Sequence, residues 1–352
     1  MPRAFFLVPG LPFSAVPFYN EGEKSRKAFL EGVWNMRYKA FGNTGMKVSE
    51  LALGTWGIGG VGWNDNPEET RLDAIRAAVE SGINFIDTAP AYNNGEAERV
   101  LGKALEDLGA RKDVIISTKC GNVFVNGTTY VRDGSAARIR RQCEDSLRNL
   151  RTDYIDLYLI HWPDPNTPFA ETMEALNQLK KEGKILHVGV SNFSQAQMEE
   201  AGQFCPIEAF QPQYSMVHRD DEALIRWAAG QGMGVMTYGS LGGGILTGAF
   251  REIQTFAPSD SRNRFYKHFQ EPTFSKVMKV LAVMDGLSAK HDNVPLAQIA
   301  LNWSAQKDFV SSCIVGAQSR KKVEQNCAAF TWALTAEEIA LLDDAIHTYL
   351  DD

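Results

Sequence analysis

Cysteine is scarce, and no cysteines have the spacing of a metal site. The five cysteines are scattered over 352 residues, their number is odd, and none belongs to a CxxC motif. A disulfide framework and a cysteine-based metal centre are therefore not expected. Reduced thiols are typical of the cytoplasm, so we predict a cytoplasmic protein that binds no metal.

The sequence also lacks long apolar runs and an excess of positive charge. No run reaches the roughly 18 apolar residues that a membrane-spanning helix requires. Lys and Arg total 36 against 43 Asp and Glu, so the net charge is −7, whereas nucleic acids and anionic membranes select basic surfaces. Pro9, Pro12 and Pro17 interrupt the apolar N-terminal stretch, which argues against a signal peptide. We expect neither nucleic acid nor a membrane as a partner.

No Pro-, Gly- or Ser-rich linker divides the chain after residue 35. Residues 1–35 show no hydrophobic period, and Met36 directly precedes the first strand-like segment. We predict that residues 1–35 form a disordered N-terminal extension and that residues 36–352 form a single domain. Loss of stability or activity on removal of residues 1–35 would contradict this prediction.

From residue 51 onward, short apolar segments alternate with amphipathic helical segments. The apolar segments are rich in Ile, Val and Leu on both faces, which is typical of buried parallel strands. The predicted strands span residues 51–54, 83–87, 114–118, 155–160, 185–190, 209–214, 234–238 and 312–315. Alternation of this kind implies parallel pairing and right-handed crossovers. Eight such units favour a closed (β/α)8 TIM barrel over an open sheet.

Further elements are expected at both ends of this α/β barrel. Residues 38–48 predict a β-hairpin around a Gly-containing turn. Extra helices are expected over residues 274–288 and 296–304, before the last strand. A final helix over residues 335–350 opens with Thr335 and Glu338, the pattern of a capping box. The predicted fold is therefore a TIM barrel with an N-terminal β-hairpin and extra C-terminal helices.

Polar side chains end three consecutive predicted strands. Asp87, Lys119 and His161 stand at the carboxyl ends of strands two, three and four, and Tyr92 follows Asp87 by five residues. Sites in such barrels lie at this end of the strands. Singly, these residues have ordinary explanations: an Asp that caps a helix, a surface Lys and a core His. Three strand-end coincidences favour a joint function, and we predict that the four side chains meet.

The mixture of side chains is suited to carbonyl chemistry. The phenol of Tyr has a pKa near 10 in water, and a nearby Lys ammonium is expected to lower it. A buried carboxylate would hold that Lys charged, while His could donate a hydrogen bond to a developing alkoxide. Together they form a proton donor and a cradle for a carbonyl oxygen. A hydride must then come from a cofactor.

Later strands carry residues suited to a dinucleotide. Ser191, Asn192 and Gln211 suit a carboxamide, Tyr238 could stack on a flat ring, and the glycine-rich turn after it could approach a pyrophosphate. Ser319 and the three basic residues at 320–322 open a helix, which suits a further phosphate and hence NADP. A solvated basic helix start is the plainer alternative. The GxGxxG at 57–62 is separated from its helix, so it is not a Rossmann motif.

These segments resemble the aldo-keto reductase family, in particular its bacterial general-stress-type members. The resemblance runs from about Tyr38 to the C-terminus, and it rests on residues 87–92, 117–119, 153–162, 189–193 and 244–248. It implies Tyr92 as proton donor, Lys119 and Asp87 as its tuning pair, and His161 as carbonyl orienter. Three positions depart from the usual family pattern: Gly239-Ser240 replaces Ser-Pro, Gly316-Ala317 replaces Gly-Thr, and Lys322 stands where Arg is frequent.

The resemblance also implies nicotinamide contacts on strands five to seven and adenine-side contacts on the last barrel helix. The predicted cofactor residues are Gly54, Thr55, Trp56, Asp87, Ser191, Asn192, Gln211, Tyr238, Gly239, Ser240, Leu241, Gly243, Gly316, Ser319, Lys322, Gln325 and Asn326. The predicted substrate pocket is lined by Trp56, Trp63, Tyr92 and Trp162.

The sequence thus predicts an NAD(P)H-dependent oxidoreductase that reduces an aldehyde or ketone, or runs the reverse oxidation of an alcohol or aldose. NADP(H) is favoured over NAD(H), the substrate is a small carbonyl compound or sugar, and the protein is a monomer or weak homo-oligomer. Two alternatives stay open. Potassium-channel β-subunits share this fold, so a cofactor-binding regulatory subunit or sensor is one. A Schiff-base lyase that uses Lys119 is the other.

Overall fold

The computed structural model describes residues 36–60, 66–126, 129–257 and 260–351. The predicted N-terminal extension, residues 1–35, and the predicted pocket residue Trp63 lie outside the described residues.

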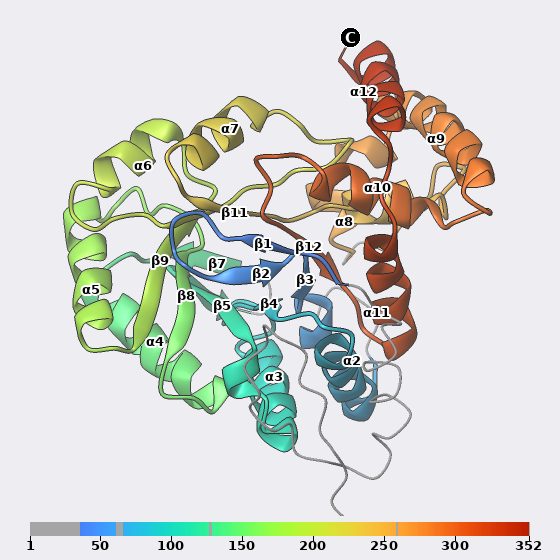
Figure 1. The fold of residues 1–352 in the computed structure, drawn as a ribbon. Helices are drawn as coiled ribbons and strands as arrows, with labels where there is room; N and C mark the ends of the chain where they lie inside the picture. The colour runs from blue at the N-terminus through green and yellow to red at the C-terminus, as the bar shows by residue number, and fades with distance from the viewer. Residues whose placement is uncertain (1–35, 61–65, 127–128, 258–259, 352) are drawn as a thin grey trace, which may run out of the picture.

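Eight parallel strands close into a barrel, as the alternating pattern predicts (Figure 1). They are β3 (Leu51–Gly54), β4 (Phe85–Asp87), β5 (Ile115–Cys120), β8 (Ile155–Ile160), β9 (Ile185–Ser191), β10 (Ala209–Gln211), β11 (Gly234–Thr237) and β12 (Ser312–Gly316). The pairing of β12 with β3 closes the ring. Strand β10 ends at Gln211 rather than at the predicted residue 214, because Pro212 has no N–H for the ladder.

Helices surround the barrel (Figure 1). Those that follow successive strands are α2 (Glu68–Glu80), α3 (Glu96–Leu108), α4 (Ala136–Leu150), α5 (Phe169–Lys181), α6 (Gln195–Ala201), α7 (Glu222–Gly230), α10 (Leu296–Ala305) and α11 (Arg320–Cys327). The additional helices are α8 (Arg262–Phe265), α9 (Thr273–Lys290) and α12 (Ala336–Leu350). Helix α12 packs on α9, and its capping box between Thr335 and Glu338 is present as predicted.

The core has two parts that follow from the alternation of side chains along each strand. One cluster fills the barrel interior and includes Phe85, Leu157 and Met236. A larger cluster lies between the strands and the helices. Because side chains fill the interior, a substrate can bind only at an end of the barrel.

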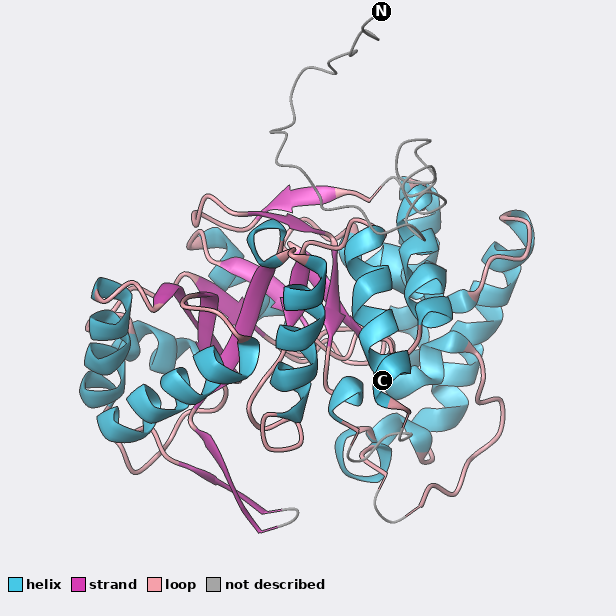
Figure 2. Cartoon of the chain, turned by 90° about the horizontal axis from the view of Figure 1, so that it is seen from below, coloured by secondary structure: helices cyan, strands magenta, loops and turns pink. Residues whose placement is uncertain are grey.

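Two hairpins lie at opposite ends of the barrel (Figure 2). The predicted hairpin is present as β1 (Tyr38–Ala40) and β2 (Lys47–Ser49), and Phe41 from its turn packs edge-on against Phe85 at a centroid distance of 5.3 Å. A second hairpin, β6 (Asn122–Asn126) and β7 (Thr129–Arg132), was not predicted. Its local signal is an Asn-Gly pair between two runs rich in β-branched and aromatic residues.

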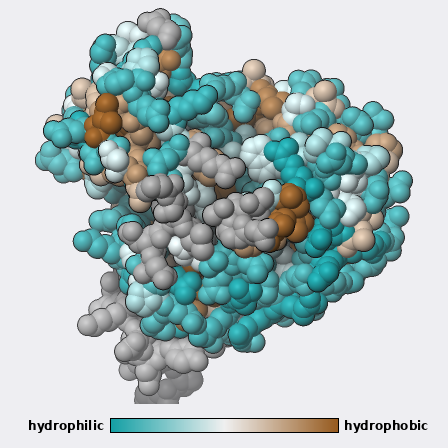
Figure 3. All heavy atoms as spheres, turned by 180° about the vertical axis from the view of Figure 1, so that it is seen from behind, coloured by the Kyte–Doolittle hydropathy of each residue, from teal (hydrophilic) through white to brown (hydrophobic). Residues whose placement is uncertain are grey.

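The surface is mainly hydrophilic on the face opposite to that of Figure 1, with hydrophobic residues in small groups (Figure 3). Within the described part of the chain, no helix is both long and apolar enough to cross a membrane.

Candidate active site

Three neighbouring strands bring the predicted polar residues to one end of the barrel. Asp87 is the last residue of β4, Lys119 is the penultimate residue of β5, and His161 follows the last residue of β8. Strand β5 pairs with both β4 and β8. The parallel order therefore places all three at the carboxyl ends of adjacent strands.

Lys119 lies at the centre of this cluster. Its Nζ donates to Oδ1 and Oδ2 of Asp87 at 2.7 and 2.8 Å and to the carbonyl of Thr88 at 2.9 Å. The same nitrogen lies 3.2 Å from the hydroxyl of Tyr92. The side chains of Lys119 and Asp87 are 1% and 3% exposed. An ammonium held by this many acceptors suits electrostatic support of the phenol better than nucleophilic attack, which disfavours the Schiff-base alternative.

A tight turn returns Tyr92 to the end of β4. The N–H of Tyr92 donates to Ala89, and that of Gly95 to Pro90. Asn93, Asn94 and Gly95 all have positive φ, a conformation that Asn and Gly adopt more readily than other residues. The five-residue spacing between Asp87 and Tyr92 is thus explained by the turn, which brings the phenol back to the end of β4 beside the carboxylate.

The pKa of Tyr92 differs from the sequence expectation. We expected Lys119 to lower it, but burial raises the pKa of Tyr92 well above 10, and the negative charge of Asp87 adds to the effect. The expectation was wrong because it considered only the effect of the ammonium on the phenol, whereas desolvation and the negative charge of Asp87 both act on the phenol in the opposite direction. Burial lowers the pKa of Lys119, with Asp87 acting in the opposite direction. Tyr92 is therefore a neutral phenol that retains its proton.

His161 faces the same phenol. Its ring lies edge-on to that of Tyr92 at a centroid distance of 6.2 Å. Burial, together with the nearby charge of Lys119, lowers the pKa of His161 well below 6.5. A neutral imidazole keeps one N–H donor, which suits a group that orients a carbonyl oxygen.

The predicted nicotinamide contacts join this cluster through hydrogen bonds. Gln211 donates its Nε2 to Oδ1 of Asp87 at 2.8 Å, and Ser191 donates its Oγ to the carbonyl of Gln211 at 2.8 Å. Asn192 donates to the carbonyl of His161 at 3.0 Å and to Ser191 Oγ at 2.9 Å. The Tyr238 hydroxyl donates to Asn192 Oδ1 at 2.9 Å. One network therefore spans both predicted subsites.

The donors and acceptors in this network fit a carboxamide. Both N–H groups of the Asn192 amide are used within the protein, whereas its Oδ1, like the side-chain oxygen of Gln211, keeps acceptor capacity. A carboxamide nitrogen needs such acceptors. The residues present therefore fit a nicotinamide ring beside Tyr238.

The turn after β11 is built from glycines in the left-handed region. Gly239, Gly242, Gly243 and Gly244 have φ of 72°, 55°, 64° and 100°. A Cβ on Gly243 would lie 2.8 Å from the ring of Tyr266, so only glycine fits there. Successive left-handed glycines expose backbone amides that suit a pyrophosphate. Leu241 leads into this turn, while the hydroxyl of Ser240 bonds to the carbonyls of two strands.

The loop after β3 supports the cluster from the other side. Thr55 donates its N–H and its hydroxyl to the carbonyl of Asp87 at 2.9 and 3.0 Å. Gly54 pairs with Asp87 on β4 and with Gly316 on β12. The glycines at 57–59 form a short 3₁₀ helix, and α2 begins only at Glu68. As predicted, these glycines therefore do not form the N-terminal turn of α2.

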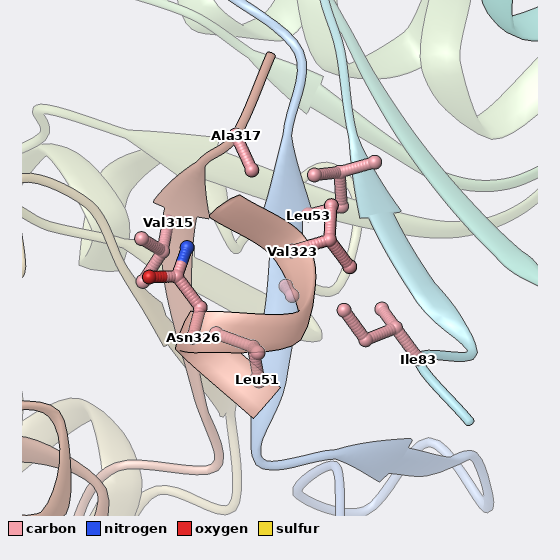
Figure 4. A pocket seen from close by; sticks show the side chains of 8 residues that line it. Leu51, Leu53, Ile83, Val315, Ala317, Val323 and Asn326 are labelled. Carbon is pink, nitrogen blue, oxygen red and sulfur yellow. The ribbon is translucent and has the colours of Figure 1, made fainter. Parts of the chain in front are cut away.

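The predicted adenine-side residues lie on α11. Ser319 is its N-cap, Lys322 and Gln325 are exposed, and Asn326 lies on the inner side next to Val315 (Figure 4). The crevice that Asn326 and Val315 line between α11 and the strands leaves no room for a water molecule. The four residues recur along one side of the helix, but no hydrogen bond connects them to the buried cluster among the described residues.

One prediction for this helix is corrected. The sequence predicts that Arg320 forms a phosphate site with Lys321 and Lys322, but Arg320 instead binds two acidic residues on α2. Its Nη2 lies 2.7 Å from Asp73 Oδ1, and its Nη1 lies 2.7 Å from Glu80 Oε2. These bonds raise the pKa of Arg320. The side chain links the first and last helices of the barrel, which only the closed ring brings together.

Aromatic residues flank the phenol of Tyr92. Trp56 stacks on Tyr92 at 6.2 Å, and Phe265 meets Trp56 edge-on at 5.8 Å. Trp162, also predicted for the pocket, lies under the guanidinium of Arg132 at 5.0 Å. Phe265, Tyr266 and Arg132 were not predicted from the sequence as site residues. Phe265 and Tyr266 lie in a segment without a recognisable period, so only the hairpin that carries Arg132 had a local signal.

Comparisons with known proteins agree with this geometry. The model of the aldo/keto reductase family matches residues 50–347. The aldo-keto reductase YhdN of Bacillus subtilis (strain 168) is 36% identical over 318 residues, which cover 90% of this chain and 96% of the relative. The NADH-specific methylglyoxal reductase of Escherichia coli (strain K12) is 34% identical, over 87% of this chain and 97% of the relative. The solved glycerol dehydrogenase AKR11B4 from Gluconobacter oxydans superposes with a TM-score of 0.80 at 34% identity, covering 90% of this chain and 96% of that one.

Proposed function

The chain belongs to the aldo/keto reductase family, and on this premise we propose that it reduces aldehydes or ketones with Tyr92 as the proton donor. It is an oxidoreductase with a (β/α)8 barrel. The observation that carries the proposal is the position of Lys119 Nζ between the carboxylate of Asp87 and the hydroxyl of Tyr92. The reverse reaction, oxidation of an alcohol or aldose, would use the same groups.

The cluster around Lys119 provides what proton delivery requires. Tyr92 keeps its proton because burial raises the pKa of the phenol. When that proton passes to the substrate oxygen, negative charge develops on the phenol 3.2 Å from Lys119 Nζ, where the ammonium stabilises it. Asp87 holds the ammonium in place, and neutral His161 can donate to the same substrate oxygen. A bound nicotinamide would supply the hydride.

Members of this family use nicotinamide cofactors, and we propose NADP(H) over NAD(H) for this chain. Support comes from Ser319 and Lys322 in the first turn of α11, where the helix dipole favours a phosphate. Arg320 is paired with Asp73 and Glu80, and the family resemblance implies a cofactor contact for Lys322 but not for Lys321. Lys322 is therefore the residue on which the preference would rest. The NADH-specific relative makes NADH the competing assignment.

Substrate, location and assembly are proposed on more general grounds. Aromatic side chains around Tyr92 suit a small carbonyl compound or a sugar. All five cysteines are buried and free, which suits the reducing cytoplasm. We also propose a monomer or weak homo-oligomer, which sedimentation over a range of concentrations would test.

Replacement of Tyr92 by Phe tests the function. The variant keeps the ring and loses the transferable proton, so kcat is expected to fall by about 10² to 10⁴-fold. Binding of NADPH, measured by fluorescence titration, should be unchanged. Tyr154→Phe is the matched control, because Tyr154 precedes β8 at the opposite end and stacks on Arg111. Retention of most turnover by Tyr92→Phe would refute the proposal.

The alternative function is that of a cofactor-binding regulatory subunit or sensor. It predicts NADPH binding without steady-state oxidation for any member of a panel of simple aldehydes, ketones and sugars. The presence of all four side chains of the cluster favours the enzyme, since a sensor has no need of a proton donor.

A further inference from the structure

The unpredicted hairpin, β6 and β7, stands between the two loops that carry the candidate catalytic residues. It begins at Asn122, separated from the end of β5 by one residue, and it extends away from the barrel (Figure 2). The hydroxyl of Tyr130 donates to the carbonyl of Ala91 at 2.9 Å, next to Tyr92. Arg132 contacts the loop after β8, next to His161. The hairpin therefore borders the entrance to the site.

Alternation along the strands assigns one face of the hairpin to this entrance. Cross-strand partners share a face, so Arg132 lies beside Asn122, and Tyr130 beside Phe124. The Phe124 and Tyr130 rings meet at 5.2 Å. The opposite face carries exposed Val131. The face that meets the active-site loops thus carries aromatic rings and a single cation.

The backbone that carries Arg132 is held firmly at the base of the hairpin. Buried Gln142 on α4 accepts from the N–H of Gly121 at 2.8 Å and donates to the carbonyl of Asn122 at 2.7 Å. The N–H of Asp133 donates to the carbonyl of Gly121 at 2.9 Å. These bonds on both sides of the hairpin fix where the Arg132 side chain begins.

The guanidinium of Arg132 is placed over an active-site aromatic ring. Its Cζ lies 5.0 Å from the ring centroid of Trp162, and its Nη1 lies 3.4 Å from the carbonyl of Pro163. Trp162 directly follows His161. Stacking on an aromatic face leaves the donors along the edge of the planar guanidinium available for an anion.

Nearby carboxylates are bound to other groups. Asp133 accepts from Ser135 and from Nε of Arg138. Asp164 accepts from the N–H groups of Gly134 and Asn166 and from the hydroxyl of Thr167. Across the residues that the structure describes, no ion pair involves Arg132. Within this described part of the chain its charge therefore has no acidic partner, in contrast to that of Lys119 or Arg320.

We infer that Arg132 binds an anionic group of the carbonyl substrate, and that the enzyme prefers aldehydes or ketones that also carry a carboxylate or phosphate. The guanidinium fork matches both anions. This inference rests on the proposed reductase function and specifies its substrate class. The ring of Trp162 would pack against the body of the substrate between the anion and the carbonyl.

Two matched substrate pairs test the inference and separate the anions. One pair is 4-carboxybenzaldehyde and its neutral isostere 4-carbamoylbenzaldehyde, and the other is glyceraldehyde 3-phosphate and glyceraldehyde. The wild-type kcat/KM is expected to be about fivefold higher for the charged member of at least one pair. In Arg132→Gln the kcat/KM values of the two members should become equal, because KM for the charged member rises while kcat is unchanged. Added salt should reduce the preference of the wild type for the charged member. It should not change the ratio of the two kcat/KM values in the variant.

Arg138→Gln is the matched control, because it removes one positive charge nearby from a residue that is paired with Asp133. It should keep the wild-type preference. Equal kcat/KM within both pairs for the wild type, or a preference that survives in Arg132→Gln, would overturn the inference and leave the reductase function intact. A lack of turnover with all four compounds and with a broader carbonyl panel would overturn the reductase function and, with it, this inference.

Discussion

The two sides of the barrel mouth use charge in opposite ways. On the side of β4, β5 and β8, Lys119 and Asp87 form a buried pair within one hydrogen-bond network. On the side of α11, Lys322 is exposed and Arg320 is only partly buried, in pairs with α2. The first side provides a fixed geometry for chemistry. The cofactor contacts proposed for the second side would be exposed, so water would screen them.

This difference has an energetic consequence. A buried ion that loses its partner cannot be resolvated, so disruption of such a pair costs about 3–5 kcal/mol. An exposed pair contributes about 0–1 kcal/mol. Substitutions on the proton-donor side should therefore act on stability and turnover together, whereas substitution of the exposed Lys322 on α11 should change cofactor affinity alone.

The largest effect is expected for Asp87→Ala. It leaves the ammonium of Lys119 buried without its carboxylate, so the free energy of unfolding should fall by about 3–5 kcal/mol in denaturant titrations. The double variant Asp87→Ala/Lys119→Met removes both charges and should recover part of this loss, with no recovery of activity. If the double variant is less stable than Asp87→Ala, the buried-charge explanation is wrong.

A smaller effect is expected for Asn192→Ala. The substitution removes hydrogen bonds to His161, Ser191 and Tyr238 and places Ala at a φ of 61°. The free energy of unfolding should fall by about 2–3 kcal/mol. Asn94→Ala controls for the backbone term, because Asn94 is exposed and has a φ of 49°. If both variants lose the same free energy of unfolding, the hydrogen bonds of Asn192 contribute nothing to stability.

The pH dependence of stability should reveal His161. In the unfolded chain the imidazole takes up a proton near pH 6.5, whereas burial keeps His161 neutral in the fold. Acid therefore favours the unfolded state, and stability falls as pH drops below about 6.5, by up to about 1.4 kcal/mol per pH unit for this group. His161→Gln should make the fall between pH 6.5 and 5 shallower. His347→Gln, which replaces a histidine whose side chain is 83% exposed, is the control.

The smallest effect is expected on α11. Lys322→Gln should weaken NADPH binding about three- to fivefold and leave NADH binding unchanged, because only NADPH carries the extra phosphate. Lys321→Gln, which removes the same charge from the next residue, is the control. Fluorescence titration with both cofactors measures the change. A parallel loss of affinity for NADH would show that Lys322 does not distinguish the two.

Much of the fold could be predicted from the sequence, because hydrophobic period and strand length are local properties. The eight strands, the helices between them and the capping box at Thr335 all followed from such patterns. The convergence of Asp87, Lys119 and His161 also followed, since a parallel barrel places every strand end on one side. The hairpin that carries Arg132 was missed although its Asn-Gly signal is local.

Other properties were decided only by the tertiary structure. The sequence shows Arg320 beside two lysines, but the closed ring brings it to Asp73 and Glu80. The sequence also shows a Tyr that Lys119 could reach, yet burial raises the pKa of that phenol. Residue types and their spacing determine which groups can meet. Which partner each charge acquires, and how much water it loses, depends on packing between segments far apart in the chain.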